Sequence, residues 1–351
     1  MDLFAKDRSA DKLPFVLLTG FLGSGKTTLL GKLLRHPGMK DSAVIVNEIG
    51  DVGLDHELIE TVGGDVALLA SGCVCCTLRG YLVEALRRLL IRRQRGEIPE
   101  FGRVAVETTG LADPAPILQL TLSDPLIAHY FRIEATIATV DAVHVMRQIH
   151  EHPEAAKQIA LADRILITKT DLAEAANGPD IERLLAGLNP LARRHVVTHG
   201  DIAPDVLFAD AVYDPKKKGL DPERWLGPPD VVPQIHQHAP HDHGMLDEAR
   251  RIRTFSLEFD RPLDWPTMAN WLNALRSGAG EGLLRVKGIL DLVGEPRPVV
   301  IHGIHHVLHP PTALAAWPSA ERRSRLVFIT RDLSRETVEE SWKSFAAASA
   351  E

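Results

Sequence analysis

The run Gly20–Thr27, GFLGSGKT, constrains the fold more than any other part of the chain. It fits the spacing G-x-x-x-x-G-K-[ST] and lies between an apolar stretch, FVLLT, and a leucine-rich helical pattern over Lys26–Arg35. Such a loop requires a buried strand before it and a helix after it, because its backbone N–H groups must converge on a phosphate at the helix N-terminus. The sequence therefore predicts a phosphate-binding loop in an α/β domain.

Alternation of strand and helix patterns extends from residue 14 to about residue 200. This alternation predicts a doubly wound, mostly parallel sheet with helices on both faces. The expected strands are Phe15–Thr19, Ala43–Asn47, Val104–Glu107, Ala135–Val140, Arg164–Thr168 and His195–Thr198.

The remainder of the chain has a different order of elements. Residues 206–249 are rich in turn-forming residues, and beyond them strands neighbour strands, which predicts a smaller α+β domain with an antiparallel sheet. Its expected elements are Ile252–Phe259, Trp265–Arg276, Leu283–Val293, Pro298–Leu308, Arg325–Thr330 and Glu336–Phe345. We therefore divide the chain into a P-loop domain over 1–205, a linker over 206–249 and a C-terminal domain over 250–351.

Residues in and near this loop have side chains suited to binding a nucleotide's phosphates and its Mg²⁺. Lys26 would bridge the β- and γ-phosphate oxygens, and the Thr27 hydroxyl would hold Mg²⁺. Glu107 ends a predicted strand, where its carboxylate could orient a Mg²⁺-bound water, and the N–H of Gly110 could contact the γ-phosphate. Lys26 and Glu107 are therefore the catalytic candidates. The other nucleotide-binding candidates in this region are Gly20, Gly23, Ser24, Gly25 and Thr28.

A second motif bears on the choice of base. The run Thr168–Asp171, TKTD, follows a predicted strand and resembles the guanine-reading N-K-x-D motif. Asp171 can accept hydrogen bonds from guanine N1–H and the 2-amino group, whereas adenine would leave the carboxylate unpaired at a cost of roughly a few kcal/mol. The stem of Lys169 would pack on the ring, and Thr168 replaces the usual Asn, which alters one contact. The motif favours GTP over ATP.

All three cysteines lie between Cys73 and Cys76. A disulfide framework would distribute cysteines along the chain and would need an even number, so the cluster indicates metal or redox chemistry. Thiolates of Cys73, Cys75 and Cys76 suit Zn²⁺, and Glu48 could supply a fourth ligand or approach Mg²⁺. A redox pair of Cys73 and Cys76 and a set of small buried side chains are the alternatives.

The histidines form two further groups. Four lie within eight residues of the linker and could capture Zn²⁺, Ni²⁺ or Co²⁺ weakly, although a merely hydrophilic linker is the alternative: His236, His238, His241 and His243. Four more lie on an expected strand of the C-terminal domain: His302, His305, His306 and His309. Strand alternation would place the first and third on one face and the second and fourth on the other, which favours structural or partner-facing roles over ligation.

Charge and hydropathy limit the partners. The chain has 40 Lys and Arg against 47 Asp and Glu, a net charge of -7, which argues against nucleic acid or an anionic membrane as the main partner. It has no apolar run of about 18 residues and no apolar segment near its N-terminus that would indicate a secretory signal. We therefore expect a cytoplasmic protein, in which thiols stay reduced.

Taken together, the motifs resemble those of a known family, the CobW-type metal-handling GTPases. The resemblance rests on Gly20–Thr27, Asn47-Glu48, Gly72–Cys76, Glu107–Gly110, Thr168–Asp171 and, further on, Arg285–Gly288, Trp317 and Leu326–Ile329. It implies a GTPase that delivers a transition metal, most often zinc, with cobalt and nickel handled by relatives.

By position, the resemblance makes Glu48, Cys73, Cys75 and Cys76 the candidates for the metal site. It implies GTP, Mg²⁺ and Zn²⁺ as the bound species. The expected partner is a client metalloprotein, and a second copy of the chain is left open. A metal store, a redox-sensing GTP-binding protein and an ATP-dependent kinase are the functions to be weighed against a metallochaperone.

Overall fold

The computed structural model describes residues 11–47, 58–61, 66–71, 78–173, 178–208, 226, 251–305, 307–314, 316–317 and 322–348. The chain divides into two compact units: Asp11–Glu182 with Ala192–Val212, and, in the remainder, the unit that contains a second sheet. None of the helices in the described ranges combines the length and the apolarity that a membrane crossing requires.

The first unit is built on a sheet with the strand order β3-β4-β2-β5-β1-β6-β7-β8. Every neighbouring pair in this sheet is parallel except β3 with β4, which is antiparallel. The strands are β1 Leu13–Gly20, β2 Ser42–Asn47, β3 Leu58–Thr61, β4 Val66–Ser71, β5 Arg103–Glu107, β6 Phe131–Asp141, β7 Arg164–Thr168 and β8 Arg193–Val197. The predicted doubly wound, mostly parallel sheet is confirmed, with the addition of β3 and β4, which the strand predictions did not include.

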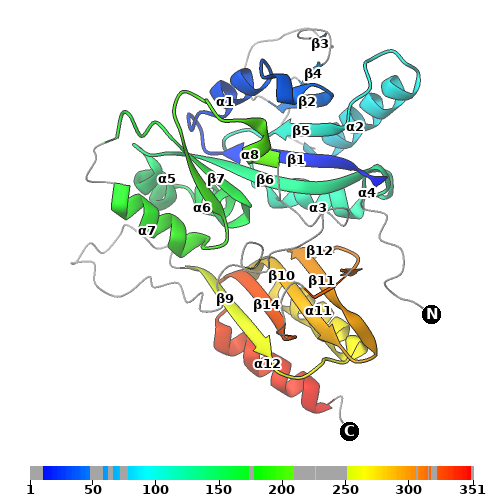
Figure 1. Ribbon diagram of the computed structural model, residues 1–351. Coiled ribbons are helices and arrows are strands. Elements are labelled where there is room, and N and C mark those ends of the chain that lie inside the picture. The colour runs from blue at the N-terminus through cyan, green and yellow to red at the C-terminus, as the bar shows by residue number, and fades with distance from the viewer. Residues whose placement is uncertain are drawn as a thin grey trace. The chain divides into compact units, whose positions relative to one another are not determined.

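Helices lie on both faces of this sheet (Figure 1). They are α1 Lys26–Leu33, α2 Leu78–Gln94, α3 Ala115–Ser123, α4 Pro125–Tyr130, α5 Val145–Glu151, α6 Pro153–Leu161 and α8 Pro204–Phe208. A further helix, α7 Gly178–Leu188, is divided between the two units after Glu182. Leu29 and Leu33 of α1 and Leu207 of α8 share a core with Val16 and Leu18 of β1. Helices α3 and α6 contact β6, and α6 also contacts β1. The central strand β1 is thereby buried, which fixes the start of the loop that follows it.

The helix after the phosphate loop is shorter than expected. It ends at Leu33, and the N–H groups of Arg35 and His36 donate to carbonyls three residues back, at 3.2 and 2.8 Å. A 3₁₀ turn, η2 over Pro37–Met39, follows at once. The chain therefore tightens before the proline instead of continuing α1 to Arg35.

The second unit has an antiparallel sheet with the order β12-β11-β10-β14-β9, and β13 pairs with β11. The predicted C-terminal α+β domain is therefore confirmed. Its elements are β9 Ile252–Phe259, α11 Trp265–Ala279, η4 Gly280–Gly282, β10 Leu283–Leu292, β11 Glu295–Ile304, β12 Val307–Leu308, β13 Thr312–Ala313, β14 Ser324–Arg331 and α12 Arg335–Ala348. The core lies where α11 and α12 cover one face of this sheet: the Trp271 ring meets Phe328 at 6.2 Å and Trp342 at 5.1 Å, edge to face.

The expected strand over Pro298–Leu308 is a hairpin, and this corrects the placement of its histidines. β11 ends at Ile304, and His305 takes a left-handed φ of 49° that reverses the chain into β12. The N–H of His309 then donates to the carbonyl of His302 at 2.8 Å, and the two rings stack with centroids 4.8 Å apart. His302 and His309 therefore lie together and not on opposite faces, while His306 lies outside the described residues.

Burial, together with the nearby Arg285, His309 and Lys287, holds the pKa of His302 well below its usual range. His302 is consequently neutral at pH 7, and its stacking on His309 does not require that like charges be brought together.

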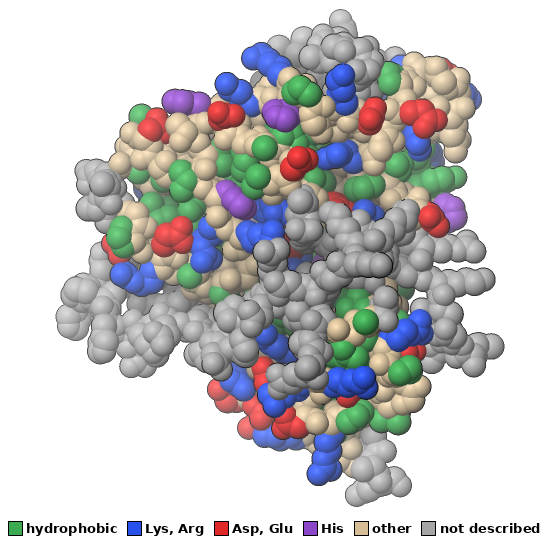
Figure 2. Space-filling model, viewed as in Figure 1, with side chains coloured by type: hydrophobic (Ala, Val, Ile, Leu, Met, Phe, Trp, Pro, Cys, Tyr) green, Lys and Arg blue, Asp and Glu red, His purple; other side chains and the backbone are tan. Residues whose placement is uncertain are grey.

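Charged side chains at the surface are mixed in sign. On the face drawn in Figure 2, basic and acidic groups are interspersed. The arginine-rich helix α2 follows the same pattern, because Arg88 pairs with Glu84 at 3.1 Å and Arg93 pairs with Glu100 at 3.2 Å. Exposed pairs of this kind contribute about 0–1 kcal/mol each, so they bear more on solubility than on stability.

The N-terminus of α11 provides a test of stability in the second unit. Asp264 is its N-cap: the backbone N–H and the hydroxyl of Thr267 donate to its carboxylate at 2.9 and 2.7 Å, and these bonds lower the pKa of Asp264. We predict that Asp264→Ala lowers the free energy of unfolding by about 1 kcal/mol at neutral pH. Because the bonds favour the ionised form, this difference should shrink as the pH falls through the lowered pKa.

Urea unfolding followed by tryptophan fluorescence measures this change, since all five tryptophans lie between residues 225 and 342. The control is Asp260→Ala. The Asp260 side chain is 84% exposed and its pair with Arg323 lies at the surface, so its removal should cost less than about 0.5 kcal/mol. Equal effects of the two substitutions would contradict the capping role.

Candidate nucleotide-binding site

The phosphate-binding loop joins the central strand β1 to α1. Gly20 and Gly25 take φ angles of 139° and 95°, which L-residues with a side chain rarely adopt. A Cβ on Gly20 would also lie 2.3 Å from the hydroxyl oxygen of Thr139, so a side chain has no room there. The backbone thus turns as the motif requires, and it does so against β6.

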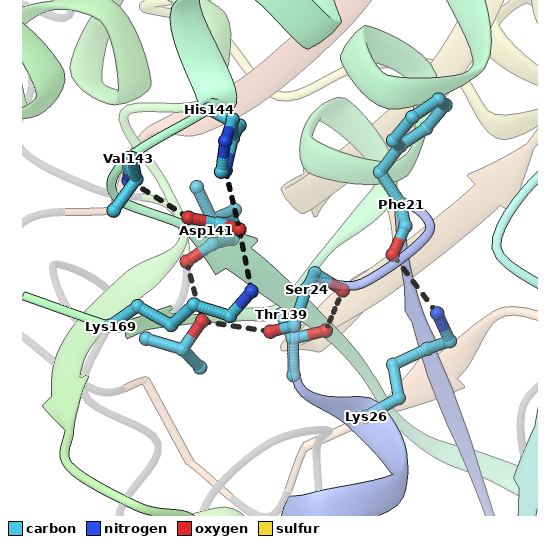
Figure 3. A network of polar contacts seen from close by, with 10 residues as sticks. Phe21, Ser24, Lys26, Thr139, Asp141, Val143, His144 and Lys169 are labelled. Atoms are coloured by element: carbon cyan, nitrogen blue, oxygen red, sulfur yellow. Dashed lines mark hydrogen bonds and ion pairs between the residues drawn. The ribbon is translucent and has the colours of Figure 1, made fainter. Parts of the chain in front are cut away.

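Lys26 and Glu107, the two catalytic candidates, both lie at this loop. The buried Lys26 curls back over it, and its Nζ donates to the carbonyls of Gly20 and Phe21 at 2.8 and 3.1 Å (the bond to Phe21 is drawn in Figure 3). The Thr27 hydroxyl donates to Glu107 Oε1 at 3.3 Å. β5 lies beside β1, with Glu107 opposite Leu18, and this register brings the carboxylate to the loop. A hydroxyl and a carboxylate are the oxygen ligands that Mg²⁺ prefers, so this pair fits the predicted magnesium site.

The side chain of Ser24 holds the phosphate loop against β6. Its Oγ lies 2.6 Å from Thr139 Oγ1, and the residue is fully buried. Figure 3 shows this bond beside the loop. The backbone of Ser24 is the part suited to a phosphate, and Thr28 is exposed on the first turn of α1.

Thr168 ties the base-reading motif to the phosphate loop. Its hydroxyl lies within hydrogen-bond distance of the Ser24 carbonyl at 2.8 Å and the Val140 carbonyl at 3.1 Å. A threonine in place of asparagine can therefore hold the loop against β6 and β7, but its single proton is used in doing so. Asp171 is exposed three residues further on, which leaves it as the base-reading candidate.

Asp141, a residue that sequence reasoning missed, organises the same corner (Figure 3). It ends β6 fully buried, and its carboxylate accepts from Lys169 Nζ at 2.8 Å and from the Val143 N–H at 2.8 Å, while His144 Nδ1 lies 3.0 Å away. Burial raises the pKa of Asp141, but these hydrogen bonds outweigh it, and the net pKa lies below the usual range. An ionised Asp141 thus holds Lys169, whose backbone is left-handed with φ 57°.

A second feature missed at the sequence level is the turn after β8. Gly200 has φ 75°, and a Cβ there would lie 2.9 Å from the carbonyl of Thr28, so this turn packs on the first turn of α1. The available signal was its position: ligands of open α/β sheets bind at the carboxyl ends of the strands, where the turn lies beside the two recognised motifs.

The candidate ligands of the thiolate metal site and of the histidine-rich linker lie outside the described residues. They are Glu48, Cys73, Cys75, Cys76, His236, His238, His241 and His243. Among the residues that the structure describes, no three His, Cys, Asp or Glu side chains lie close enough together to hold a metal ion.

Comparisons with known proteins find a family of nucleotide-binding proteins, as the phosphate-binding loop indicates. The family model "CobW/HypB/UreG, nucleotide-binding domain" matches residues 14–195, and "Cobalamin synthesis protein cobW C-terminal domain" matches residues 252–346. The chain is 34% identical over 322 residues to the zinc chaperone YjiA of Escherichia coli, covering 92% of this chain and 95% of that protein. It is 29% identical over 361 residues to the zinc chaperone CobW of Pseudomonas aeruginosa, covering 93% and 90%.

A crystal structure of Zn(II)-bound YjiA GTPase from E. coli superimposes with a TM-score of 0.72 at 30% identity, covering 95% of this chain and 99% of that one. The fold and the loop define a P-loop GTPase with an antiparallel C-terminal domain. Within that class, the chain belongs to the CobW/HypB/UreG family, which confirms the resemblance noted from its motifs.

The assignment of Asp171 can be tested by exchanging its carboxylate for an amide. We predict that Asp171→Asn weakens GTP binding by about tenfold or more, because the amide cannot accept from both guanine donors. The same amide can donate to the 2-oxo group of xanthine, so xanthosine triphosphate should gain affinity. Competition against a fluorescent nucleotide measures both changes. Asp180→Asn, an exposed carboxylate in the first turn of α7, is the matched control, and an unchanged GTP preference in Asp171→Asn would show that the base is read elsewhere.

Proposed function

We propose that this GTPase is a metallochaperone that binds Zn²⁺ through Cys73, Cys75 and Cys76 and passes it to a client protein under the control of GTP. The observation that supports this most directly is the register of three neighbouring strands. Asn47 of β2 lies opposite Ser71 of β4, and Val46 lies opposite Glu107 of β5. The strands that precede Glu48 and Cys73 therefore end at the same border of the sheet as Glu107.

The argument from this register is topological. The carboxyl ends of parallel strands meet at one edge of a sheet, and ligands of such sheets bind there. Glu48 is the residue directly after β2, and Cys73 is two residues beyond the end of β4. The carboxylate donor and the first sulfur donor thus follow, within two residues in sequence, strands that end beside the strand of Glu107. Relatives named as zinc chaperones make zinc the first metal to test, with cobalt and nickel as the alternatives.

The hydrolytic site consists of groups with separate tasks. Lys26 would exchange its loop carbonyls for the β- and γ-phosphate oxygens and neutralise charge that develops there. Glu107 would orient a water bound to Mg²⁺, and the N–H of Gly110 would hold a γ-phosphate oxygen. Mg²⁺, held by the Thr27 hydroxyl, would supply further neutralisation of the phosphate charge.

Nucleotide control would follow from the shared border. GTP would order the segments that follow β2 and β4 and so assemble the thiolate site, and hydrolysis would release them together with the ion. Such coupling must be reciprocal, because a nucleotide that tightens zinc binding is itself bound more tightly by the zinc-loaded protein. Exchange of zinc with a client in this way requires thiols that stay reduced, which is the condition in the cytoplasm.

The coupling predicts a measurable difference in zinc affinity. Competition with a chromophoric chelator should give affinities that differ by about fivefold or more between the nucleotide-free protein and the protein bound to a non-hydrolysable GTP analogue. The analogue should in turn bind the zinc-loaded protein more tightly by the same factor. Equal zinc affinities in the two forms would contradict nucleotide control.

Two variants separate the sites. Lys26→Ala should abolish GTP hydrolysis and leave zinc affinity of the nucleotide-free protein unchanged. Joint substitution of Cys73, Cys75 and Cys76 by Ser should remove tight zinc binding and preserve nucleotide affinity. If GTP hydrolysis by the wild-type protein stays negligible even with zinc and a client present, a metal store is favoured. If the purified protein holds no stoichiometric metal and forms a reversible disulfide, a redox sensor is favoured.

A further inference from the structure

The segment after β5 contacts the phosphate loop at backbone level. A Cβ on Gly110 would lie 2.6 Å from the Leu22 nitrogen and 2.7 Å from its Cα, so residue 110 must be a glycine for the two backbones to meet. The N–H of Ala112 donates to the carbonyl of Thr109 at 3.1 Å and closes a tight turn around Gly110. This turn places the proposed contact to the γ-phosphate directly beside the loop that would hold the nucleotide.

One side chain of α6 holds that turn. Gln158 is 1% exposed, and its Nε2 donates to the carbonyl of Gly110 at 3.1 Å and to the carbonyl of Ala112 at 3.0 Å. Both neighbours are acceptors, so only the NH₂ end of the amide can face them. The two protons of one amide group thereby fix two carbonyls of the turn that contains Gly110.

Helix α6 reaches the same region at two more points. Lys157 Nζ lies 2.8 Å from Asp113 Oδ2, just beyond the turn, in a pair whose side chains are 14% and 28% exposed. His152, the residue before α6, packs its ring on Phe21 of the phosphate loop with centroids 4.6 Å apart. The residue that caps α6 therefore touches the phosphate loop, and the helix itself touches the turn.

We propose that Gln158 is a positioning residue for GTP hydrolysis, which acts by fixing the turn around Gly110 so that the Gly110 N–H faces the γ-phosphate. Glycine by itself rotates freely at both backbone dihedral angles, and a hydrogen bond to its carbonyl removes part of that freedom before the nucleotide arrives. The inference rests on the proposed role of Gly110. Since GDP has no γ-phosphate, loss of this device should weaken binding of GTP and spare binding of GDP.

The first test compares GDP with a non-hydrolysable GTP analogue in Gln158→Leu. Leucine keeps the buried volume and removes both donors, leaving two carbonyls without this partner. Affinity for the analogue should fall about tenfold, affinity for GDP should change less than about twofold, and kcat should fall with the analogue's affinity. Gln148→Leu on the neighbouring helix α5 is the matched control and should alter none of these quantities. Equal losses for the two nucleotides, or no loss in a folded variant, would overturn the proposal.

Gln158→Glu adds a readout that a purely structural role would not change. An ionised glutamate would repel the two carbonyls, whereas a protonated one can donate to one of them, and burial raises the pKa of such a carboxyl group. Affinity of this variant for the analogue should therefore rise as the pH is lowered from about 8 to about 6. Gln158→Leu should show no such rise over the wild-type protein, and a flat profile for Gln158→Glu would count against the proposal.

Two more variants keep the outcome interpretable. If Gln158→Leu does not fold, Lys157→Met removes the second hold on the segment and should give a smaller loss with the same GTP-over-GDP selectivity; equal effects on both nucleotides would overturn the inference. Gly110→Ala tests the underlying assignment. Because its methyl group would meet the backbone of Leu22, equal losses of the analogue and of GDP would show that the variant displaces the phosphate loop, and would contradict a role of Gly110 confined to the γ-phosphate. If it leaves analogue binding intact, the role of Gly110 is wrong. If it weakens the analogue selectively while Gln158→Leu does not, Gly110 stands and only the positioning role of Gln158 fails.

Discussion

Hydrogen bonds of two threonine hydroxyls hold the phosphate loop against the sheet, and the rest of the nucleotide site depends on them. The loop has glycines in left-handed conformations, which cost conformational entropy to fix. Thr139 of β6 bonds the Ser24 hydroxyl, and Thr168 of β7 bonds the Ser24 carbonyl. The neighbouring strands β6 and β7 thus both bind Ser24 of the loop. These two bonds support the loop from the sheet side, and Lys26 adds a third hold through its bonds to the Gly20 and Phe21 carbonyls.

Local signals were enough to predict six of the eight strands of the first sheet. β7 has the predicted bounds, and β1 extends them by a few residues, because an apolar run bounded by polar residues fixes a buried strand. β3 and β4 were missed, although Val66–Ser71 is mostly apolar and glycines flank it closely. The hairpin at His305 was missed for another reason. Alternation assumes that a strand continues, and a left-handed φ at a residue other than glycine has no clear sequence signal.

The site residues that the motifs could not predict make contacts with residues far away in the sequence. Lys26, Thr27 and Glu107 follow from motif spacing, and the structure brings them together. Asp141 is 28 residues from Lys169, and Gln158 is 48 residues from Gly110, so only the folded sheet pairs them. Neither residue belongs to a motif. Both act on residues that do, which is why single-sequence reasoning identifies the groups facing the ligand before it identifies their supports.

The shared border of β2, β4 and β5 has a consequence for how such proteins can diverge. Strand pairing ends at Asn47, Ser71 and Glu107, and the residues named as metal donors come after those positions. Hydrogen bonds of the sheet do not depend on which donor atoms follow. A different cation could therefore be accommodated by exchanging short insertions on an unchanged nucleotide-binding core, a modular arrangement that protein engineering could exploit directly.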